Sequence, residues 1–260
     1  MKRVLAAAVA AAALLTAAPA QAAAPDPVRA LEKQFVAGHG VKISEVSRME
    51  ATDEAPSTSQ MTGTYAFGES GIVAADLTMR SRPKKSSPLM TFRFVIVDKQ
   101  VYVQGQGLEK ELPEGKTWVR LGGAANATVT SHPVDIFRPA ALKGLLSHAR
   151  SVKSGLYSGS LTSKQLSKLN ASKSGLPMDY RLNIGPTGLP SRLRTSSQLD
   201  FGKWWVRETA DTRYSAWGHK ATIEAPPEEQ VIDSKDIENT GLDEMLEALQ
   251  LIPNEALASR

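Results

Sequence analysis

Apolar and polar residues alternate with a period of two along much of the chain, which is the pattern of β-strands with one buried and one solvated face. The clearest case spans residues 178–225, where three segments that read as antiparallel strands and a short fourth follow one another: MDYRLNIG, LPSRLRTSSQL, WWVRETADTRY and ATIEA. Between the first two lies Gly185-Pro186-Thr187-Gly188, whose proline presets φ and whose glycines permit positive φ. This part predicts a sheet that is apolar on one face.

An earlier run of alternating segments predicts an antiparallel meander. The expected strands are one from Val41 toward Met49 and others at 60–67, 72–79, 89–97, 101–103 and 118–121, with a further strand at 152–160. The large apolar residues that share one phase in these strands and in the later sheet are candidate cavity-lining residues. They are Tyr65, Phe67, Leu77, Met79, Phe92, Phe94, Ile96, Tyr180 and Leu182.

Helical periodicity appears at four places. A helix is expected to start at Asp26-Pro27, and a short helix or turn at 164–169. A central helix begins at Pro139 and carries an apolar stripe that includes Leu142, Leu145 and Leu146. A C-terminal helix at 240–251 has Thr240 as its N-cap and an apolar stripe at i, i+3, i+4 and i+7, formed by Leu242, Met245, Leu246 and Leu249. We interpret both stripes as a lid over the apolar face.

The first 22 residues read as an export signal. Lys2-Arg3 is a charged start, residues 4–18 are apolar, and Ala20-Gln21-Ala22 fits an A-x-A cleavage site after Ala22. The apolar run of about 15 residues is shorter than the ~20 that a membrane span needs, so a cleaved signal is favoured over an uncleaved anchor. The expected organisation is a signal peptide at 1–22, one β-rich domain at 23–233 and an acidic amphipathic tail at 234–260, in a secreted, extracytoplasmic protein.

The amino-acid composition limits which kinds of site and partner the chain can have. The chain of 260 residues contains no cysteine, which excludes disulfides, thiolate metal sites and a lipidated N-terminal cysteine. Its net charge is only +4, and it falls to +2 once Lys2 and Arg3 leave with the signal, so nothing indicates nucleic-acid binding. Within the mature chain the tail is −4 and the preceding body +6, and these opposite signs favour docking of the tail on the body.

Catalytic motifs are weak throughout. Residues 81–84 match S-x-x-K, but they lie in an expected hairpin tip and the motif's partner elements are missing. The four histidines have no metal-ligand spacing, and each is expected at the surface or at a helix end: His39, His132, His148 and His219. We therefore expect no enzyme activity, no cofactor and no metal.

The aromatic residues allow two interpretations. The tryptophans Trp118, Trp204, Trp205 and Trp217, together with Phe92 and Phe94, could form an ordinary core under a helix. They could instead line an apolar cavity between a curved sheet and its lid, since a sheet of roughly ten strands tends to curl.

The order of elements resembles actinobacterial exported proteins of the LppX/LprG-like lipoprotein class, which in turn look like the LolA/LolB lipoprotein carriers. The resemblance covers roughly residues 41–231. Its most specific pieces are the turn at 183–190 and Tyr214…Trp217-Gly218 followed by Ile223-Glu224-Ala225-Pro226-Pro227. Members usually carry a lipobox cysteine, which this chain lacks, and the acidic tail is not part of their pattern.

The resemblance implies a mainly β fold of the α+β type, a single strongly curved antiparallel half-barrel with helices on its concave face and a cavity for acyl chains. The first hypothesis is a non-enzymatic carrier of a lipid or acylated molecule, monomeric and at most peripherally associated with membranes. The alternative is an extracytoplasmic interaction or sensor module that binds a partner protein.

Overall fold

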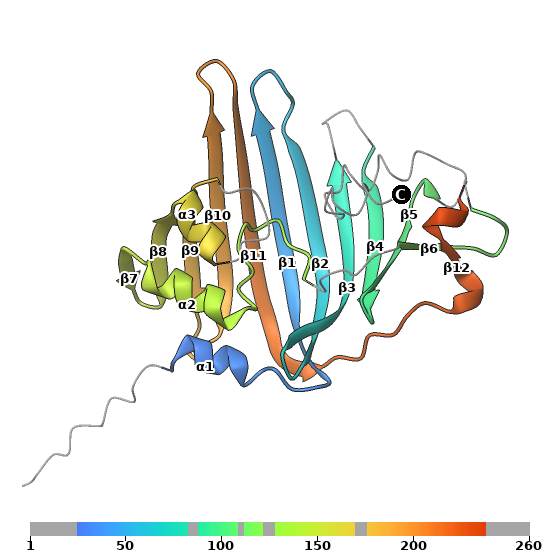
Figure 1. The fold of residues 1–260 in the computed structure, drawn as a ribbon, viewed down its shortest axis with the longest axis horizontal. Helices are drawn as coiled ribbons and strands as arrows, with labels where there is room; N and C mark the ends of the chain where they lie inside the picture. Colours follow the sequence, from blue (N-terminus) through green and yellow to red (C-terminus); the bar gives the residue numbers. More distant parts are fainter. Residues whose placement is uncertain (1–24, 83–87, 109–111, 122–127, 170–175, 238–260) are drawn as a thin grey trace, which may run out of the picture.

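A computed structural model describes residues 25–82, 88–108, 112–121, 128–169 and 176–237. These residues form one sheet of twelve strands with a few short helices (Figure 1). The strands are β1 (His39–Ala51), β2 (Ser57–Gly68), β3 (Gly71–Arg82), β4 (Met90–Val97), β5 (Gln100–Gly105), β6 (Trp118–Leu121), β7 (Ser151–Lys153), β8 (Leu156–Leu161), β9 (Met178–Ile184), β10 (Pro190–Asp200), β11 (Trp205–Lys220) and β12 (Val231–Asp233). The expected signal peptide and C-terminal helix, with Leu242, Met245, Leu246 and Leu249, lie outside the described residues.

The strand order is β12-β6-β5-β4-β3-β2-β1-β11-β10-β9-β8-β7, so the described sheet is open and does not close into a barrel. Two meanders make it up, β1 to β6 and β7 to β11, and they join where β1 pairs antiparallel with β11 along nearly its whole length. All pairs are antiparallel except the edge pair, in which Val231–Asp233 runs parallel to Trp118–Arg120. The predicted mainly β, antiparallel architecture is therefore confirmed in its coarse form.

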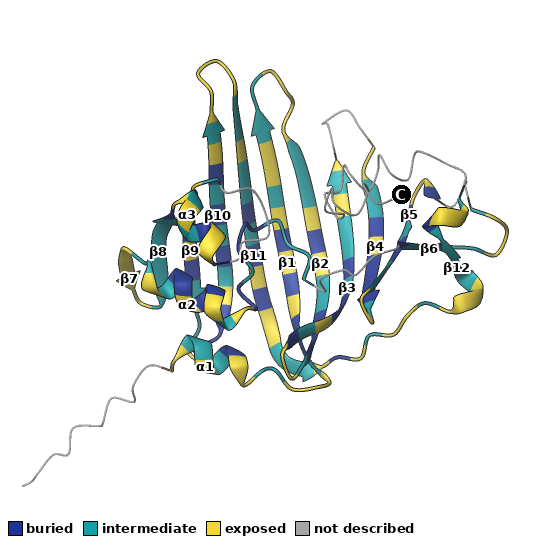
Figure 2. Cartoon of the chain, viewed as in Figure 1, coloured by how far each residue is buried: buried dark blue, intermediate teal, exposed yellow. Residues whose placement is uncertain are grey.

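The alternation that predicted the strands is visible in their burial (Figure 2). In β9, Met178, Tyr180 and Leu182 are buried, while Asp179 and Arg181 are exposed. We call the face that carries Tyr180 the inner face of the sheet; the opposite face has smaller apolar clusters, one of which holds Val95, Tyr102, Trp118 and Val231.

The described helices are short and gather at one end of the sheet. They are α1 (Pro27–Glu32), α2 (Pro139–Ser147) and α3 (Ser163–Lys168). Two 3-10 turns, η2 (Glu228–Gln230) and η3 (Ser234–Asp236), flank β12 at the opposite edge. Both α2 and α3 contact β8, and α1 contacts α2 (Figure 1). The expectation that helices cover the inner face is therefore not confirmed, since the described helices gather at this end. Over the centre an irregular segment, residues 128–138, takes their place; we call it the covering segment. No described helix is long and apolar enough to span a bilayer.

Two local predictions were wrong. The expected strand at 152–160 is the hairpin β7–β8, because Ser154 and Gly155 both adopt positive φ and reverse the chain. Residues 221–225 (ATIEA) form no strand, since β11 ends at Lys220 and two prolines follow. Just after the expected boundary at 233/234, Ser234 is buried and Ile237 packs against the main core.

Candidate functional site

The candidate wall residues all lie on the inner face and belong to one apolar cluster. Eight of them are buried in it, namely Tyr65, Phe67, Leu77, Phe92, Phe94, Ile96, Tyr180 and Leu182, and Met79 packs against it half-buried. These residues come from β2, β3, β4 and β9, so the cluster extends across most of the sheet. The structure thus brings the predicted residues together in a packed interior.

Of the candidate lid residues, those of α2 lie on this cluster. Leu142 and Leu145 are fully buried in it, and Leu146 packs against it. The hydroxyl of Tyr180 donates a hydrogen bond to the carbonyl of Leu145 over 2.6 Å, which ties α2 to β9. The pKa of Tyr180 is raised to about 12, chiefly by burial.

An aromatic cluster anchors the C-terminal end of the covering segment. Phe137 lies at its centre, with ring centroids 5.3 Å from Tyr65, 5.6 Å from Tyr214 and 5.9 Å from Trp217. The Trp217 ring stacks on Phe67, and the Tyr65 hydroxyl donates to the backbone carbonyl of Val129. The covering segment is therefore attached to β2 at both of its ends, and to β11 at its Phe137 end.

Of the tryptophans considered above, Trp217 belongs to this inner cluster, whereas Trp118 is buried on the opposite face beneath the guanidinium of Arg93. Trp204 is exposed and Trp205 half-buried. The four therefore neither form one core nor line one cavity.

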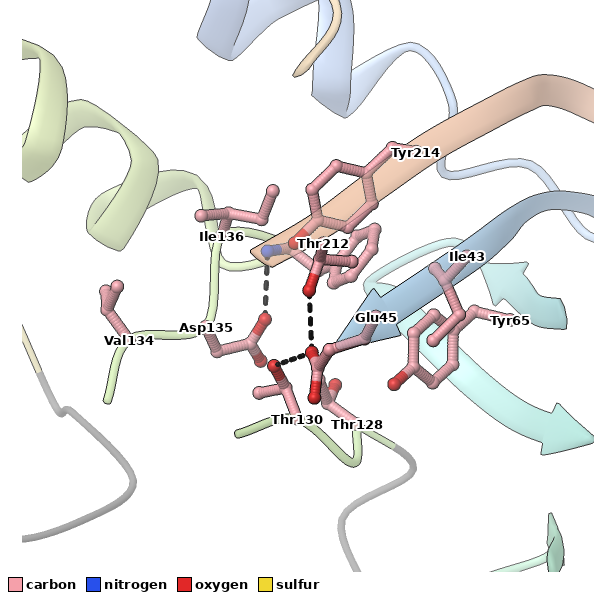
Figure 3. Close-up of a pocket in the computed structure, with 11 residues that line it drawn as sticks. Ile43, Glu45, Tyr65, Thr128, Thr130, Val134, Asp135, Ile136, Thr212 and Tyr214 are labelled. Carbon is pink, nitrogen blue, oxygen red and sulfur yellow. Dashed lines mark hydrogen bonds between the residues drawn. The ribbon is translucent and has the colours of Figure 1, made fainter. Parts of the chain in front are cut away.

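A buried carboxylate holds the middle of the covering segment. Glu45 of β1 is only 3% exposed, and three donors converge on it. Its Oε2 accepts hydrogen bonds from the hydroxyls of Thr130 (3.0 Å) and Thr212 (2.6 Å) (Figure 3). Its Oε1 accepts from the backbone N–H of Ser131 (3.0 Å). A buried charge is tolerated only when it is hydrogen-bonded in this way.

His132 extends this network to β10. Its Nδ1 lies 2.8 Å from Thr195 Oγ1 and its Nε2 lies 2.8 Å from Thr212 Oγ1. Because Thr212 spends its one hydroxyl proton on Glu45, it must accept from His132, so the ring carries its proton on Nε2 and accepts from Thr195 at Nδ1. We call Glu45, Thr130, His132, Thr195 and Thr212 the polar latch.

The expectation that His132 lies at the surface was wrong, because its side chain is 1% exposed. Burial lowers its pKa, and the carboxylates of Glu45 on β1 and Asp211 on β11 oppose that shift. The ring is therefore neutral, and the latch is a chain of neutral donors that ends on one carboxylate. The other histidines are half-buried, and His148 follows α2 as expected for a helix end.

A small pocket lies beneath the covering segment, beside the latch (Figure 3). Its volume is about 10 Å³, room for one water molecule, and Glu45, Asp135, Tyr65 and Tyr214 face it together with threonine hydroxyls. Burial raises the pKa of Asp135 and, well above the usual range, the pKa values of both tyrosines. Among the described residues no group of acidic and histidine side chains is arranged to hold a metal ion.

The inner face is consequently divided by polarity. Below the latch it is apolar, as predicted, but across β1, β11 and β10 it carries Glu45, Thr212, Thr195 and Ser197, all buried. The hydroxyl of Ser197 has no partner among the described residues. Glu45 occupies the inward phase set by Val41 and Ile43 in the sequence VKISE, so strict alternation already indicated a buried acid; the contribution of His132 left no comparable signal.

Comparisons with known proteins give only distant similarities. No family profile and no curated protein matches the chain. Among solved structures, LprF from Mycobacterium bovis is similar with 14% identity and a TM-score of 0.40, over 77% of this chain and 95% of that one. A DUF1329 family protein from Desulfovibrio piger is similar with 13% identity, a TM-score of 0.29 and coverages of 77% and 96%. A LolA superfamily protein from Nitrosomonas europaea is similar with 12% identity, a TM-score of 0.28 and coverages of 78% and 94%.

Proposed function

We propose that this chain is an exported, non-enzymatic carrier or binder of a lipid or lipoprotein that bears acyl chains. The site is the inner face of the sheet beneath the covering segment. The observation that supports this proposal is that irregular chain, rather than a helix, covers the aromatic centre of a wide apolar sheet face. Such a cover can move without the melting of a secondary-structure element.

The binding energy of this site comes from burial alone. An acyl chain contributes ~0.8 kcal/mol for each CH₂ that leaves water, so it needs no specific polar partner along its length. Because the pocket beside the latch has a volume of only about 10 Å³, the structure corresponds to the closed form. Cargo enters when the covering segment leaves the aromatic cluster and the acyl chain takes over its contacts. The polar side chains of the latch then face the polar end of the cargo.

Extraction of the purified protein with organic solvent, followed by mass spectrometry, tests the proposal directly, and uptake of a fluorescent fatty acid measures the site. Phe94→Glu places a charge on the inner face and should abolish uptake. Val95→Glu is the matched control, because Val95 is equally buried on the same strand but faces the other side. If the Phe94→Glu variant still takes up the fatty acid, as well as the Val95→Glu variant does, the inner face is excluded as the binding site.

Since either charge could unfold the protein, a milder pair is needed. Phe94→Ala removes bulk from the inner face and should shift the preference toward longer or branched acyl chains. Val95→Ala should leave the preference unchanged. Circular dichroism of all four variants verifies that they are folded.

The alternative function is an interaction or sensor module that binds a partner protein. The closely packed inner face and the small volume of the pocket favour it, because a filled core is what a module without cargo requires. Absence of lipid from the extract, together with no uptake of any acyl probe by the folded protein, would support this alternative.

A further inference from the structure

Two aromatic rings are exposed to solvent at the tip of the β10–β11 hairpin. Phe201 is 66% exposed and Trp204 is 46% exposed, the most exposed aromatic residues of the described chain. Their rings stack on each other with centroids 5.5 Å apart. The turn that carries them is Asp200-Phe201-Gly202-Lys203-Trp204, so a lysine lies between the two aromatic residues in the sequence.

The turn holds these rings in a fixed presentation. The N–H of Phe201 donates to the carbonyl of Trp204 over 2.7 Å, and the carboxylate of Asp200 accepts from the N–H of Gly202 over 2.8 Å. Gly202 has φ +80°, which a side chain would strain. The neighbouring β1–β2 hairpin braces the turn, because Thr52 exchanges hydrogen bonds with the backbone of Trp205.

Both hairpin tips project at the same end of the sheet, away from α1 (Figure 1). Toward that end the inner face carries a mixture of side chains: Leu199 and Val206 are half-buried, Met49 is 38% exposed, and Glu208 shares their inward phase. Three apolar side chains therefore lie on the inner face between the latch and the aromatic tip, beside one acid.

The size of the tip argues against a protein partner. Aromatic side chains present about 150–250 Å² each, so the exposed parts of the two rings amount to roughly 200 Å². A stable protein interface takes about 800 Å² from each partner. A bilayer imposes no such minimum, because each ring that enters the headgroup region contributes independently, and tryptophan is enriched there.

The charged side chains of these two hairpins give no net attraction to anionic lipids. Residues 48–57 and 198–208 together carry three basic and five acidic side chains, and Arg207 is held by the amide oxygen of Gln198. Lys203 is thus the single cation within the turn. Beyond these two hairpins, Arg80 and Arg82 of β3 lie toward the same end, because Arg82 pairs with Thr58. The hairpins themselves carry a net charge of −2, so their insertion into a bilayer must come from the rings.

We propose that the Phe201–Trp204 tip docks on the surface of a phospholipid bilayer by inserting its two rings into the headgroup region of zwitterionic lipids. The docking goes beyond the carrier function and does not depend on it, since it uses no residue of the cluster beneath the covering segment. In the proposed carrier, it would bring this end of the inner face beside the membrane from which an acyl chain enters.

Co-sedimentation with phosphatidylcholine vesicles tests the docking. The full chain should bind, and Phe201→Ser/Trp204→Ser should weaken binding by at least about tenfold, because each ring buried contributes on that scale. Val152→Ser is the matched control: Val152 is 59% exposed on the edge strand β7, and its loss should leave binding unchanged. Both variants should keep the wild-type Tm.

A separate experiment measures how deeply Trp204 inserts into the bilayer. Vesicles that contain brominated lipid should quench the tryptophan emission of the wild type, and Trp204→Phe should retain binding with weaker quenching. Salt at 0.5 M should not release the protein, and anionic lipid should not strengthen binding.

Four outcomes would overturn the proposal. They are no sedimentation of the wild type, equal sedimentation of the double serine variant, binding that needs anionic lipid and is lost in salt, and self-association that the double variant abolishes without any vesicle binding. Uptake of a soluble fluorescent fatty acid without vesicles separates this proposal from the carrier function: the double serine variant should take it up as the wild type does. Vesicle binding without any uptake would reject the carrier and leave the docking in place.

Discussion

The middle of the covering segment is attached to the sheet through a single buried carboxylate, that of Glu45. Three hydrogen bonds end on it, and two of the donors, Thr130 and Ser131, belong to the covering segment itself. Hydrogen bonds to a charged group contribute about 1.5–3 kcal/mol each, and a buried donor left without its partner costs about 1–3 kcal/mol. This one side chain thus accepts the hydrogen bonds that hold the middle of the covering segment, between its attachments at Val129 and Phe137.

His132 makes the stability of the protein sensitive to mild acid. Because burial lowers its pKa, the folded protein holds the proton less tightly than the unfolded chain does. Protons therefore favour the unfolded chain once the pH falls below about 6.5, and stability decreases from there downward. Asp135 acts in the opposite sense, because its raised pKa makes the folded state the better proton acceptor.

We accordingly expect wild-type Tm to fall between pH 7.5 and 5.5 more steeply than the Tm of His132→Gln. The difference between the two proteins removes the contributions that they share, including that of Asp135. His219→Gln is the control, because it changes a histidine at the end of β11 outside the latch. Parallel Tm curves for wild type and His132→Gln would contradict the assignment of a neutral, buried imidazole.

Individual residues show where sequence reasoning reaches its limit. Period-2 alternation placed Phe92, Phe94, Tyr180 and Leu182 on one face, because the geometry of a strand allows no other outcome. It could not place His132, since the covering segment has no periodicity and its course depends on partners 63 and 80 positions away, Thr195 and Thr212.

At the scale of elements, one hydroxyl of β11 connects the polar latch: Thr212 bonds both His132 of the covering segment and Glu45 of β1. Thr212→Val removes the group that links His132 to Glu45 and leaves a buried donor unpaired, which should lower the free energy of unfolding by about 1–3 kcal/mol. The segment should also open more often, so cleavage within residues 128–138 by a protease and binding of a hydrophobic dye should both rise. Urea denaturation and limited proteolysis measure the two effects.

Thr209→Val is the control for that experiment, since it makes the same change on the same strand in the outward phase. Equal dye binding and equal cleavage in the two variants would show that the polar latch does not hold the covering segment.

Most elements follow from local patterns, and the exceptions have local reasons. The helix at Pro139 was predicted because proline fits a first helical position and the leucines recur at helical spacing. The edge strand β12 was not predicted, because three residues are too few for periodicity and its parallel partner β6 lies more than a hundred positions away. Side chains define that pair instead: Arg120 donates to Asp233 and Glu228.

For the molecule as a whole, the tail after Ile237 is proposed to act as a plug over the apolar face. Its amphipathic stripe of Leu242, Met245, Leu246 and Leu249 must be buried to be stable, because a helix of about 12 residues is marginal in water. Removal of the tail should raise both the binding of a hydrophobic dye and the uptake of a fatty acid.

The cut is best made after Ile237 rather than before Ser234, because Ser234 is buried and Ile237 packs on the main core. A truncated protein with unchanged dye binding and uptake would mean that the tail docks elsewhere or not at all. High salt offers a second measurement on the intact chain, since it screens the attraction between the acidic tail and the basic body.

The pairing of β1 with β11 has a consequence for the order in which the protein folds. The two halves of the sheet are local meanders, each able to form from neighbours in sequence, but the seam between them joins residues as far apart as Thr52 and Trp205. Closing a loop of that length costs entropy before any contact repays it, and folding slows accordingly. Until the seam closes, β1 presents an unpaired edge, which is a template for pairing with other chains. The centre of the finished sheet, its most extensively paired part, thus cannot form until β11 has been synthesised, and β1 lacks this partner strand until then.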